Sequence, residues 1–307
     1  MRALRFILAF VDLLLAPAVL LFFACRARRT KNSGIHGGIF YSFAMNISPL
    51  ILIGGGNMGG AMARRWQAAG LGPVHVVEPD AARRSELAAS GLTAHEFLED
   101  APLSDIYVLA IKPQQFAASH ATLTHEISDR ESLLISIMAG VPLHELRTIT
   151  PNAVRVMPNL PALIGESMSV ACAPGLDEHR KAQVQHLLSL IGAVAWVEKE
   201  HDLHAVTAIS GSGPAYVFAF MEALQQAAIA HGLPAELARQ LVNQTLRGAT
   251  HLAEQSVEEV ATLRAQVTSK GGTTEAALKS FTHDHFAEAI GRAVTAALHR
   301  SVALSEK

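Results

Sequence analysis

A short apolar run that leads directly into a glycine-rich turn constrains the fold of this chain more than any other feature. Residues 50–53 read LILI, and three glycines follow with the spacing G-x-G-x-x-G before a helical pattern begins. In a strand–turn–helix unit such glycines permit a tight turn, the approach of a pyrophosphate and close packing of helix on strand. The turn predicts a dinucleotide site at a helix N-terminus, and the alternative is a glycine-rich turn without a ligand. The candidate cofactor-binding residues here are Gly54, Gly56, Asn57, Met58 and Gly59.

The next predicted strand, residues 74–78, raises the question of which dinucleotide binds. It ends at Glu78, where a carboxylate would hydrogen-bond the ribose 2′-hydroxyl of NAD and repel the 2′-phosphate of NADP. Arg83 and Arg84 follow, and either guanidinium could clamp that phosphate. Adjacent charges are also common on a solvated helix face. The sequence therefore leaves NAD and NADP open.

Further apolar runs follow at the spacing of an α/β protein. They are near-continuous rather than alternating, as expected of strands covered on both faces. Together with a helical stretch at 177–191 they predict a doubly wound Rossmann sheet. The predicted strands occupy residues 105–112, 133–140, 153–158, 167–173 and 193–198.

Ligands of a doubly wound sheet lie beyond the carboxyl ends of its strands. The turns that contain Lys112 and Pro113, and Ala139 and Gly140, follow two of the predicted strands. We expect these residues to border the nicotinamide ring. For the Lys112–Pro113 pair, a simple strand terminator is an equal alternative.

Strand signals stop after Glu198, and helical punctuation takes over. Pro and Gly residues delimit helices at about 214–232 and 234–255. A capping-box pattern of Ser256 and Glu259 predicts a third helix that ends at about residue 267, and a last helix is expected at 284–304. Several of these segments are apolar on more than one face, which predicts burial in at least a homodimer. The alternative is a monomer with an unusually well-covered core.

The segment QVTSKGGTTEAAL, residues 266–278, contains four hydroxyl side chains and a Gly-Gly pair at the start of a predicted helix. Free backbone N–H groups of a first helical turn, backed by hydroxyl groups, form an anion site suited to a small carboxylate. An ordinary Gly-Gly turn with a threonine N-cap is the alternative. The candidate residues are Ser269, Gly271, Gly272, Thr273 and Thr274.

At this point the chain resembles the pyrroline-5-carboxylate reductase family, over nearly all of residues 45 to about 300. The resemblance rests on IGGGNMGGAM, LAIKPQ, VRVMPNLPALIGE, AVTAISGSGPAYVF and, most specifically, VTSKGGTTEAAL. It implies a Rossmann domain followed by an all-helical dimerisation domain, with dimers often assembled into larger rings. It also implies the last step of proline biosynthesis, with NADPH as the preferred cofactor and NADH possible.

For the site, the resemblance implies that the 269–274 loop grips the substrate carboxylate and that Thr274 contacts the ring nitrogen. Ser212 is expected to shape the same pocket, although a helix-start turn is an equal interpretation. Because the protonated imine already accepts a hydride readily, positioning rather than a strong acid would supply the acceleration. Lys270 departs from the proline of many members, which puts loop rigidity and local charge in question.

Two other functions compete with this one. A β-hydroxyacid dehydrogenase of similar architecture would need a helical-domain lysine, and residues 214–255 contain none. A non-catalytic nucleotide sensor would have no use for the hydroxyl-rich loop. A reductase of a related cyclic imine also stays open, because one methylene in a pocket is worth only about 1–3 kcal/mol.

Composition excludes several partners. With a formal charge of −2 the chain offers no basic field for nucleic acid, and two cysteines are too few for a disulfide framework. No Cys/His cluster has metal-ligand spacing, so we expect no metal. A small-molecule substrate and a cytoplasmic enzyme are the resulting expectations.

The first 44 residues differ in kind from the rest. Residues 6–25 are apolar except for Asp12, and a basic run follows, which is about the pattern and length of a membrane span. The extension is interpreted either as a membrane anchor or as an upstream translation before a start at Met45. The expected organisation is therefore an extension at 1–44, a dinucleotide-binding domain at 45–199 and a helical dimerisation and substrate domain at 200–307.

Overall fold

The computed structural model describes residues 49–128 and 131–305. They belong to one compact unit that spans residues 47–307. The predicted membrane anchor at 1–44 lies outside the described residues. Within the described residues, no helix combines the length and the apolar character that a membrane crossing requires.

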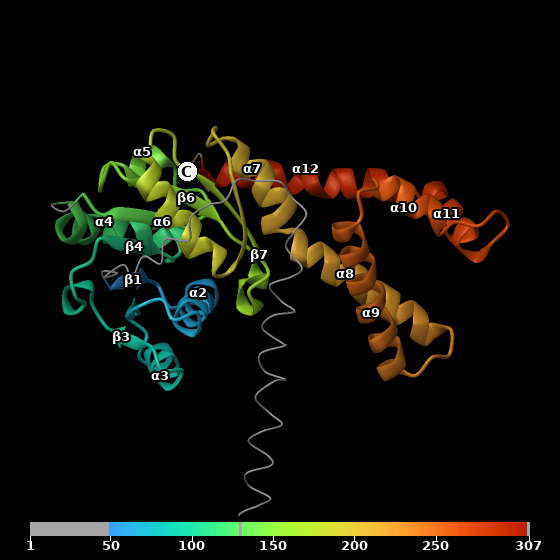
Figure 1. The fold of residues 1–307 in the computed structure, drawn as a ribbon, viewed down its shortest axis with the longest axis horizontal. Helices are drawn as coiled ribbons and strands as arrows, with labels where there is room; N and C mark the ends of the chain where they lie inside the picture. The colour runs from blue at the N-terminus through green and yellow to red at the C-terminus, as the bar shows by residue number, and fades with distance from the viewer. Residues whose placement is uncertain (1–48, 129–130, 306–307) are drawn as a thin grey trace, which may run out of the picture. The chain divides into compact units, whose positions relative to one another are not determined.

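The described residues form one mixed sheet with the strand order β3-β2-β1-β4-β5-β6-β7-β8 (Figure 1). Neighbouring strands are parallel, except that β6 and β7 pair antiparallel with Arg155 opposite Cys172. The first six strands have the order of a dinucleotide-binding Rossmann fold, as the sequence predicted. The strands are β1 Leu50–Ile53, β2 Val74–Val77, β3 Thr93–His95, β4 Ile106–Leu109, β5 Leu133–Ser136, β6 Ala153–Met157, β7 Ser167–Cys172 and β8 Gly192–Trp196.

Helices cover both faces of this sheet, which explains the near-continuous apolar strands. Leu50 and Leu52 belong to one buried cluster and Ile51 and Ile53 to the other, because successive strand residues point to opposite faces. Helices α2, α3 and α6 pack on the first face, and α4, α5 and α7 on the second. Their bounds are α2 Asn57–Ala68, α3 Ala81–Ala89, α4 Pro113–Ile127, α5 Leu143–Leu146, α6 Glu178–Ser189 and α7 Asp202–Val206, with short 3-10 helices η1 Leu98–Asp100 and η3 Leu160–Ile164.

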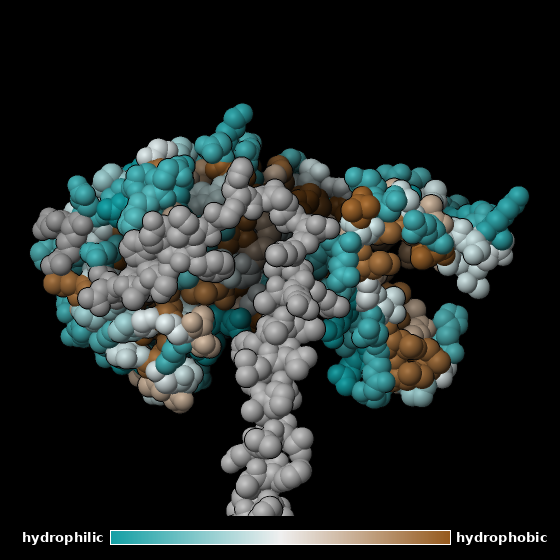
Figure 2. Space-filling view, viewed as in Figure 1, coloured by the Kyte–Doolittle hydropathy of each residue, from teal (hydrophilic) through white to brown (hydrophobic). Residues whose placement is uncertain are grey.

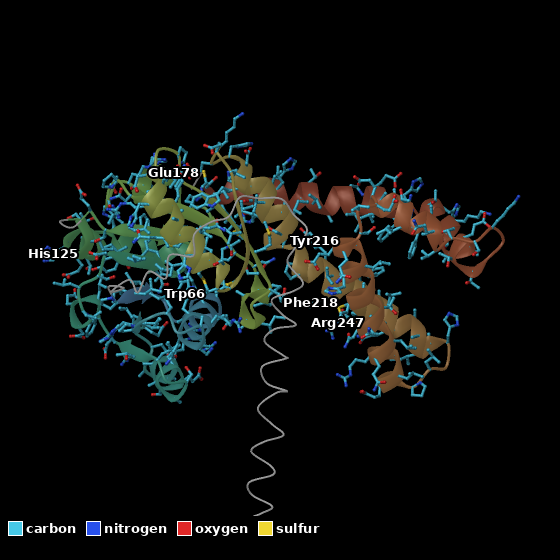
Figure 3. The ribbon with its side chains drawn as sticks, in the orientation of Figure 1. Trp66, His125, Glu178, Tyr216, Phe218 and Arg247 are labelled. Carbon is cyan, nitrogen blue, oxygen red and sulfur yellow. The ribbon has the colours of Figure 1, made fainter. Side chains whose placement is uncertain are left out.

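Trp66 ties two of these helices together. Its side chain is fully buried, and the indole Nε1 donates a hydrogen bond of 2.7 Å to the carbonyl oxygen of Leu187, which joins α2 to α6 (Figure 3). A buried indole N–H needs such a partner. The helix that carries the glycine turn is therefore fixed to the sheet by both packing and a hydrogen bond.

The chain continues as helices from residue 202 onward, as the sequence predicted. A π-helix, η4 Thr207–Gly211, leads into α8 Gly213–Ala230, α9 Ala235–Gln255, α10 Val260–Gln266, α11 Thr273–His283 and α12 Phe286–Ser305. The predicted Ser256–Glu259 capping box is wrong. Glu259 is itself the N-cap residue of α10, and its side chain makes no capping hydrogen bond. The Ser256 hydroxyl instead accepts from the N–H of Glu258, two residues later in the same short turn.

The helical part leaves much apolar surface uncovered. No residue of α8, α10, α11 or α12 is fully buried. Figure 2 shows hydrophobic side chains on the visible face of these helices. On α8 the Tyr216 hydroxyl donates to the carbonyl oxygen of Ala208, whereas Phe218 is 55% exposed (Figure 3). An apolar surface of this kind marks an interaction site in a soluble protein. The described residues therefore do not form the well-covered monomer core that was the alternative expectation.

The last helix runs back to the sheet domain. Helix α12 packs on α11, on α7 and on the π-helix. Near its end, the Ser301 hydroxyl lies 3.0 Å from Nδ1 of His204. The carbonyl oxygen of Leu304 lies close to Gly140, because a Cβ built on Gly140 would be 2.7 Å from this oxygen. The C-terminal end of α12 thus contacts Gly140, one of the candidate cofactor-binding residues, and its N-terminal end packs on α11, where Phe286 stacks on Phe281.

Candidate functional site

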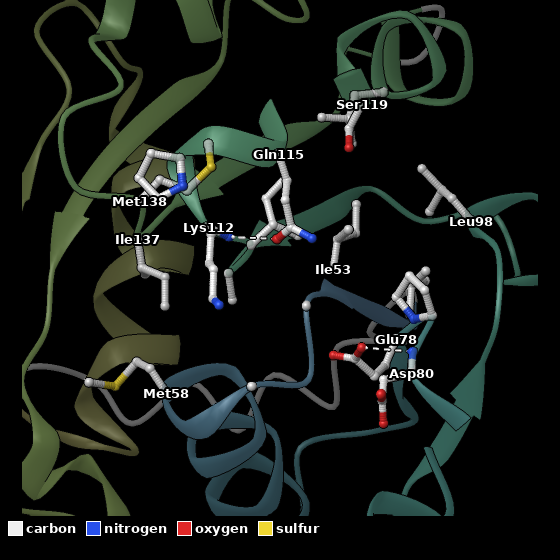
Figure 4. Close-up of a pocket in the computed structure, with 18 of the residues that line it drawn as sticks. Ile53, Met58, Glu78, Asp80, Leu98, Lys112, Gln115, Ser119, Ile137 and Met138 are labelled. Carbon is white, nitrogen blue, oxygen red and sulfur yellow. Dashed lines mark hydrogen bonds between the residues drawn. The ribbon is translucent and has the colours of Figure 1, made fainter. Parts of the chain in front are cut away.

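A cleft of about 1220 Å³ opens beyond the carboxyl ends of β1, β2, β4 and β5 (Figure 4). This is where the topology of a doubly wound sheet places a ligand. Candidate residues from four predicted turns meet here, including Gly54, Glu78, Lys112 and Ala139. Every residue that lines the cleft belongs to the described stretch 53–158.

The glycine turn has the geometry that a phosphate cradle requires. Gly54 has a φ of +104°, and a Cβ at Gly59 would lie 2.1 Å from the carbonyl oxygen of Gly54. A Cβ built on Gly56, by contrast, would have only Nη1 of Arg83 near it, at 3.7 Å, so the backbone of Gly56 faces open space. Gly56 caps α2 without any side-chain hydrogen bond, which leaves the first N–H groups of α2 free to bind an anion. These residues fit the pyrophosphate of a dinucleotide.

Glu78 lies at the β2 end of the cleft in a fixed orientation. Its Oε2 accepts from the Gly55 N–H at 2.9 Å, and its Oε1 accepts from the Asp80 N–H at 3.0 Å (Figure 4). The residue is only 7% exposed, yet it lines the cleft. Each carboxylate oxygen keeps a second acceptor position beyond these contacts. The side chain can therefore receive a hydroxyl without giving up its backbone bonds.

The two arginines after Glu78 have different surroundings. Arg84 donates to the carbonyl oxygen of Glu78 at 2.9 Å and to that of Pro79, and it pairs with Glu96 at 2.8 Å. Arg83 lines the cleft and forms no ion pair among the described residues. The arrangement commits Arg84 to bracing the end of β2 and leaves Arg83 as the guanidinium that faces a ligand.

Apart from Lys112, the opposite end of the cleft is mainly apolar. Lys112 and Pro113 line it together with Ala139 and Met157. Gly140 does not line the cleft, because its φ of +80° turns it toward Leu304 at the end of α12. A planar, largely apolar ring such as nicotinamide suits this lining.

The 269–274 loop lies outside the cleft of the same chain. Gly272, not a threonine, is the N-cap of α11, so the threonine N-cap that the sequence left as an alternative is not formed. Ser269, Gly271 and Thr273 are exposed, and Thr274 is half-buried. Helix α11 packs on α12. The structure therefore presents the loop at the surface of the helical part.

A carboxylate already occupies one donor of this loop. The Gly271 N–H donates to Oε2 of Glu275 at 2.5 Å, while Oε1 of Glu275 pairs with Lys279 at 3.1 Å. The Gly271 N–H is the main cause that lowers the pKa of Glu275 below its ordinary value, and Lys279 adds to it. The Gly272 N–H donates to the carbonyl oxygen of Ser269 at 3.0 Å. The loop thus holds an anion, here one from its own helix.

Ser212 reaches the neighbourhood of the cleft through its turn. The adjacent Gly211 lies against Met157, whose Cε would be 2.5 Å from a Cβ at that glycine. Asn159 fixes this contact, since its Nδ2 donates to the carbonyl oxygen of Ser210 at 3.0 Å. Its Oδ1 accepts from the Met168 N–H at 2.9 Å and from the Ser167 hydroxyl at 3.1 Å.

Sequence reasoning did not find Asn159, Met157 or Glu275. Asn159 stood within the motif VRVMPNLPALIGE, but its partners at Ser167 and Ser210 depend on the folded topology. The position of Glu275, one helical turn after the glycine pair, could have indicated its hydrogen bond with the Gly271 N–H. No group of three or more potential metal ligands occurs among the residues that the structure describes.

Comparison with known proteins decides the family. Residues 200–304 match the model for pyrroline-5-carboxylate reductase dimerisation, and residues 50–140 match the model for NADP oxidoreductase, coenzyme F420-dependent. A pyrroline-5-carboxylate reductase of Haemophilus influenzae is 38% identical over 82% of this chain and 96% of its own length. The chain belongs to the pyrroline-5-carboxylate reductase family. A second family member, from Pasteurella multocida, is 39% identical over 84% of this chain and 98% of its own length.

Solved structures of the family agree in fold. A pyrroline-5-carboxylate reductase from Coxiella burnetii superposes with a TM-score of 0.78 at 33% identity, over 85% of this chain and all of the other. The Plasmodium falciparum enzyme, whose structure has NADP bound, gives a TM-score of 0.76 at 30% identity, over 84% and 99%. The family architecture of a Rossmann domain followed by a helical dimerisation domain is thus present here.

Proposed function

We propose that this protein is a pyrroline-5-carboxylate reductase, which transfers a hydride from NAD(P)H to the C=N carbon of 1-pyrroline-5-carboxylate and yields L-proline. The observation that carries the proposal is the similarity to reductases of that name at 38–39% identity over most of both chains. The cleft supports it, because the glycine turn fits a pyrophosphate and the apolar end fits a nicotinamide ring. The bound cofactor supplies the hydride, and the remaining work belongs to the residues of the chain.

Positioning is the main contribution of these residues. The first turn of α2 and the glycines Gly54, Gly56 and Gly59 would hold the pyrophosphate, with Asn57 and Met58 beside it. Lys112, Pro113 and Ala139 would border the nicotinamide. Water protonates the imine nitrogen, and the electron pair of the C=N bond becomes the N lone pair as the hydride reaches carbon. Bringing the two reactants together in a fixed geometry lowers the barrier by several kcal/mol, up to about 7–11 in favourable cases.

The substrate would be held by the 269–274 loop. The N–H groups of Thr273 and Thr274 at the start of α11 suit a carboxylate, Gly272 lets the carboxylate approach the backbone closely, and the Ser269 hydroxyl adds a donor. The Thr274 hydroxyl would orient the ring nitrogen. Gly271 can join them once Glu275 releases its N–H.

Since the loop lies outside the cleft of its own chain, we propose that a second copy completes the site. The match to a dimerisation model and the exposed apolar surface of α8, α9 and α12 support this assembly. The corresponding domain limits are 45–199 for dinucleotide binding and 200–307 for dimerisation and substrate binding. A reducing cytoplasm, which supplies reduced nicotinamide, is the proposed compartment.

The test is an assay of the full-length protein with 1-pyrroline-5-carboxylate, following NADPH and NADH oxidation by absorbance and L-proline by chiral chromatography. We expect turnover with production of L-proline. The six-membered cyclic imine serves as the competing substrate, and a higher kcat/KM for it would reassign the enzyme. Binding of nucleotide without turnover of either imine would refute the proposal and favour a sensor.

Thr274→Ala tests the assigned role within the same assay. We expect kcat to fall by about 10-fold or more, since one orienting hydrogen bond is lost, while the Kd for the cofactor stays unchanged. Thr282→Ala on the same helix is the matched control, because its hydroxyl only bonds back to the carbonyl oxygen of Leu278. Equal kinetics for the two variants would remove Thr274 from the mechanism.

A further inference from the structure

Preference between the two dinucleotides rests on the group that meets the adenosine 2′ position. Glu78 is the carboxylate at that end of the cleft, and backbone N–H groups hold both of its oxygens. To turn away from a 2′-phosphate it would have to break the bonds to Gly55 and Asp80 and leave the buried Gly55 N–H without a partner. Because Glu78 is buried, that loss is costly. The carboxylate is therefore a fixed feature of the cleft.

The free acceptor positions of Glu78 discriminate between the two groups. A ribose 2′-hydroxyl can donate a proton to a carboxylate oxygen, which is a strong charge-assisted hydrogen bond. A 2′-phosphate is largely a dianion at neutral pH and has only acceptor oxygens to offer. The same anchored side chain thus binds the hydroxyl and repels the phosphate.

The neighbouring charges do not offset this repulsion. Asp80 and Glu96 line the cleft as well and add negative charge near Glu78. The N-terminus of α3, which could otherwise attract a phosphate, is already capped by Asp80, whose Oδ1 accepts from the Arg83 N–H at 2.9 Å. Arg84 is neutralised by its pair with Glu96.

Among the described residues that line the Glu78 end of the cleft, Arg83 is the cation without a carboxylate partner. Its Nη1 lies over Gly56, at the part of the turn that receives the pyrophosphate. Both dinucleotides carry that pyrophosphate, so a contact there raises both affinities without distinguishing them. The 2′ position is left to Glu78.

We infer that the enzyme prefers NADH to NADPH and that Glu78 sets this preference. The inference rests on the proposed reductase function, and it reverses the NADPH preference that the family resemblance implied. Its consequence is that the adenosine end of the cleft, rather than the substrate loop, determines which cellular pool of reduced nicotinamide this chain uses.

Calorimetric titration with 5′-AMP and with 2′,5′-ADP tests the inference on the full chain without requiring catalysis. The wild type is expected to bind 5′-AMP about tenfold or more tightly, the scale of repulsion between like charges a few ångströms apart in a solvated cleft. NADH and NADPH, titrated the same way, should give the same order. Equal or tighter binding of 2′,5′-ADP overturns the inference whatever the enzyme reduces.

Glu78→Gln tests the residue. The variant is expected to lose affinity for 5′-AMP and gain affinity for 2′,5′-ADP, so that the ratio changes about tenfold. Glu99→Gln, which neutralises another carboxylate of the cleft, is the matched control and should leave the ratio unchanged. Arg83→Ala should weaken both nucleotides alike. If Glu78→Gln and Glu99→Gln alter the ratio equally, Glu78 is not the determinant.

Circular dichroism establishes that each variant is folded, because Glu78 also braces the glycine turn. Glu78→Asp is the second variant, since it keeps the charge but is too short for both backbone bonds. It should retain discrimination against 2′,5′-ADP while binding both nucleotides less tightly. Reductase turnover that is faster with NADPH would leave the proposed function standing and refute the cofactor inference alone.

Discussion

Asn159 joins the cleft to the helical domain, and its removal gives the clearest test of that joint. Its amide makes three hydrogen bonds with Ser210, Ser167 and Met168 at 3.0, 3.1 and 2.9 Å, and the residue is 8% exposed. Asn159→Ala removes the partner of one buried group, the Ser167 hydroxyl, and of two half-buried groups, the Met168 N–H and the Ser210 carbonyl oxygen. At about 1 kcal/mol for each bond, the free energy of unfolding should fall by about 3 kcal/mol. That is a large share of a total of about 5–15 kcal/mol.

Asn159→Asp separates the functional contact from the structural ones. One carboxylate oxygen can still accept from Ser167 and Met168, but the other would face the carbonyl oxygen of Ser210. We expect the turn before α8 to loosen, with kcat/KM reduced about tenfold while the Kd for the cofactor is nearly kept. Asn152→Asp is the matched control, because its Nδ2 donates to the carbonyl oxygen of Glu131 at an exposed site.

Two measurements check this reasoning. Thermal unfolding should show Asn159→Ala about 6–12 °C below the wild type, since about 2–4 °C accompanies each kcal/mol in a domain of this size. Steady-state kinetics with the imine should show the loss for Asn159→Asp. If both Asn159 variants match Asn152→Asp in Tm and kcat/KM, the amide does not couple the two domains.

Three further changes test other parts of the structure. Gly59→Ala would place a Cβ 2.1 Å from a backbone carbonyl oxygen, so calorimetry should show nucleotide affinity reduced at least about 100-fold; retained affinity would contradict the close contact of helix and turn. Glu275→Ala should free the Gly271 N–H and lower the KM for the imine roughly threefold at unchanged kcat, whereas a higher KM would mean that Glu275 braces the loop. Burial lowers the pKa of His75 from 6.5, and the neighbouring His95, at 2.9 Å, lowers it further. Below about pH 6.5 the unfolded state therefore binds more protons than the folded state. The stability contributed by neutral His75 is present above pH 6.5 and is lost as the pH falls toward the pKa of the folded state. His75→Phe should therefore flatten the plot of urea midpoint against pH below pH 6.5. An unchanged slope would exclude His75 as the source of this pH dependence.

Much of the sheet could be predicted because its strands are buried on both faces and therefore read as apolar runs. The glycine turn was readable for a related reason, since only glycine fits where Gly59 contacts the Gly54 carbonyl. Strand β3 escaped prediction because it is three residues long with an exposed Thr93. The reversal between β6 and β7 was also unreadable, because direction depends on how the η3 connection folds.

The candidate site was predicted in parts but not as an assembly. The sequence indicated a cofactor end in one domain and a carboxylate loop in the other, and nothing in the order of residues shows that the loop lies outside the cleft of its own chain. The bond from Gly271 to Glu275 was missed because periodicity cannot show which acceptor a free N–H finds first. The role of Asn159 was missed because its partner Ser210 lies 51 residues away along the chain.

The buried indole of Trp66 gives this protein an intrinsic optical reporter of one domain. The chain has two tryptophans, Trp66 and Trp196, and both belong to the sheet domain. Trp66 is fully enclosed on the helix that begins at the glycine turn, while Trp196 is partly exposed and donates to Gln185 at 2.8 Å. Emission near the blue end of the tryptophan range would therefore follow the packing of α2. If subunits associate through the helical domain as proposed, their separation would leave that emission unchanged, and fluorescence and sedimentation together would distinguish unfolding from dissociation.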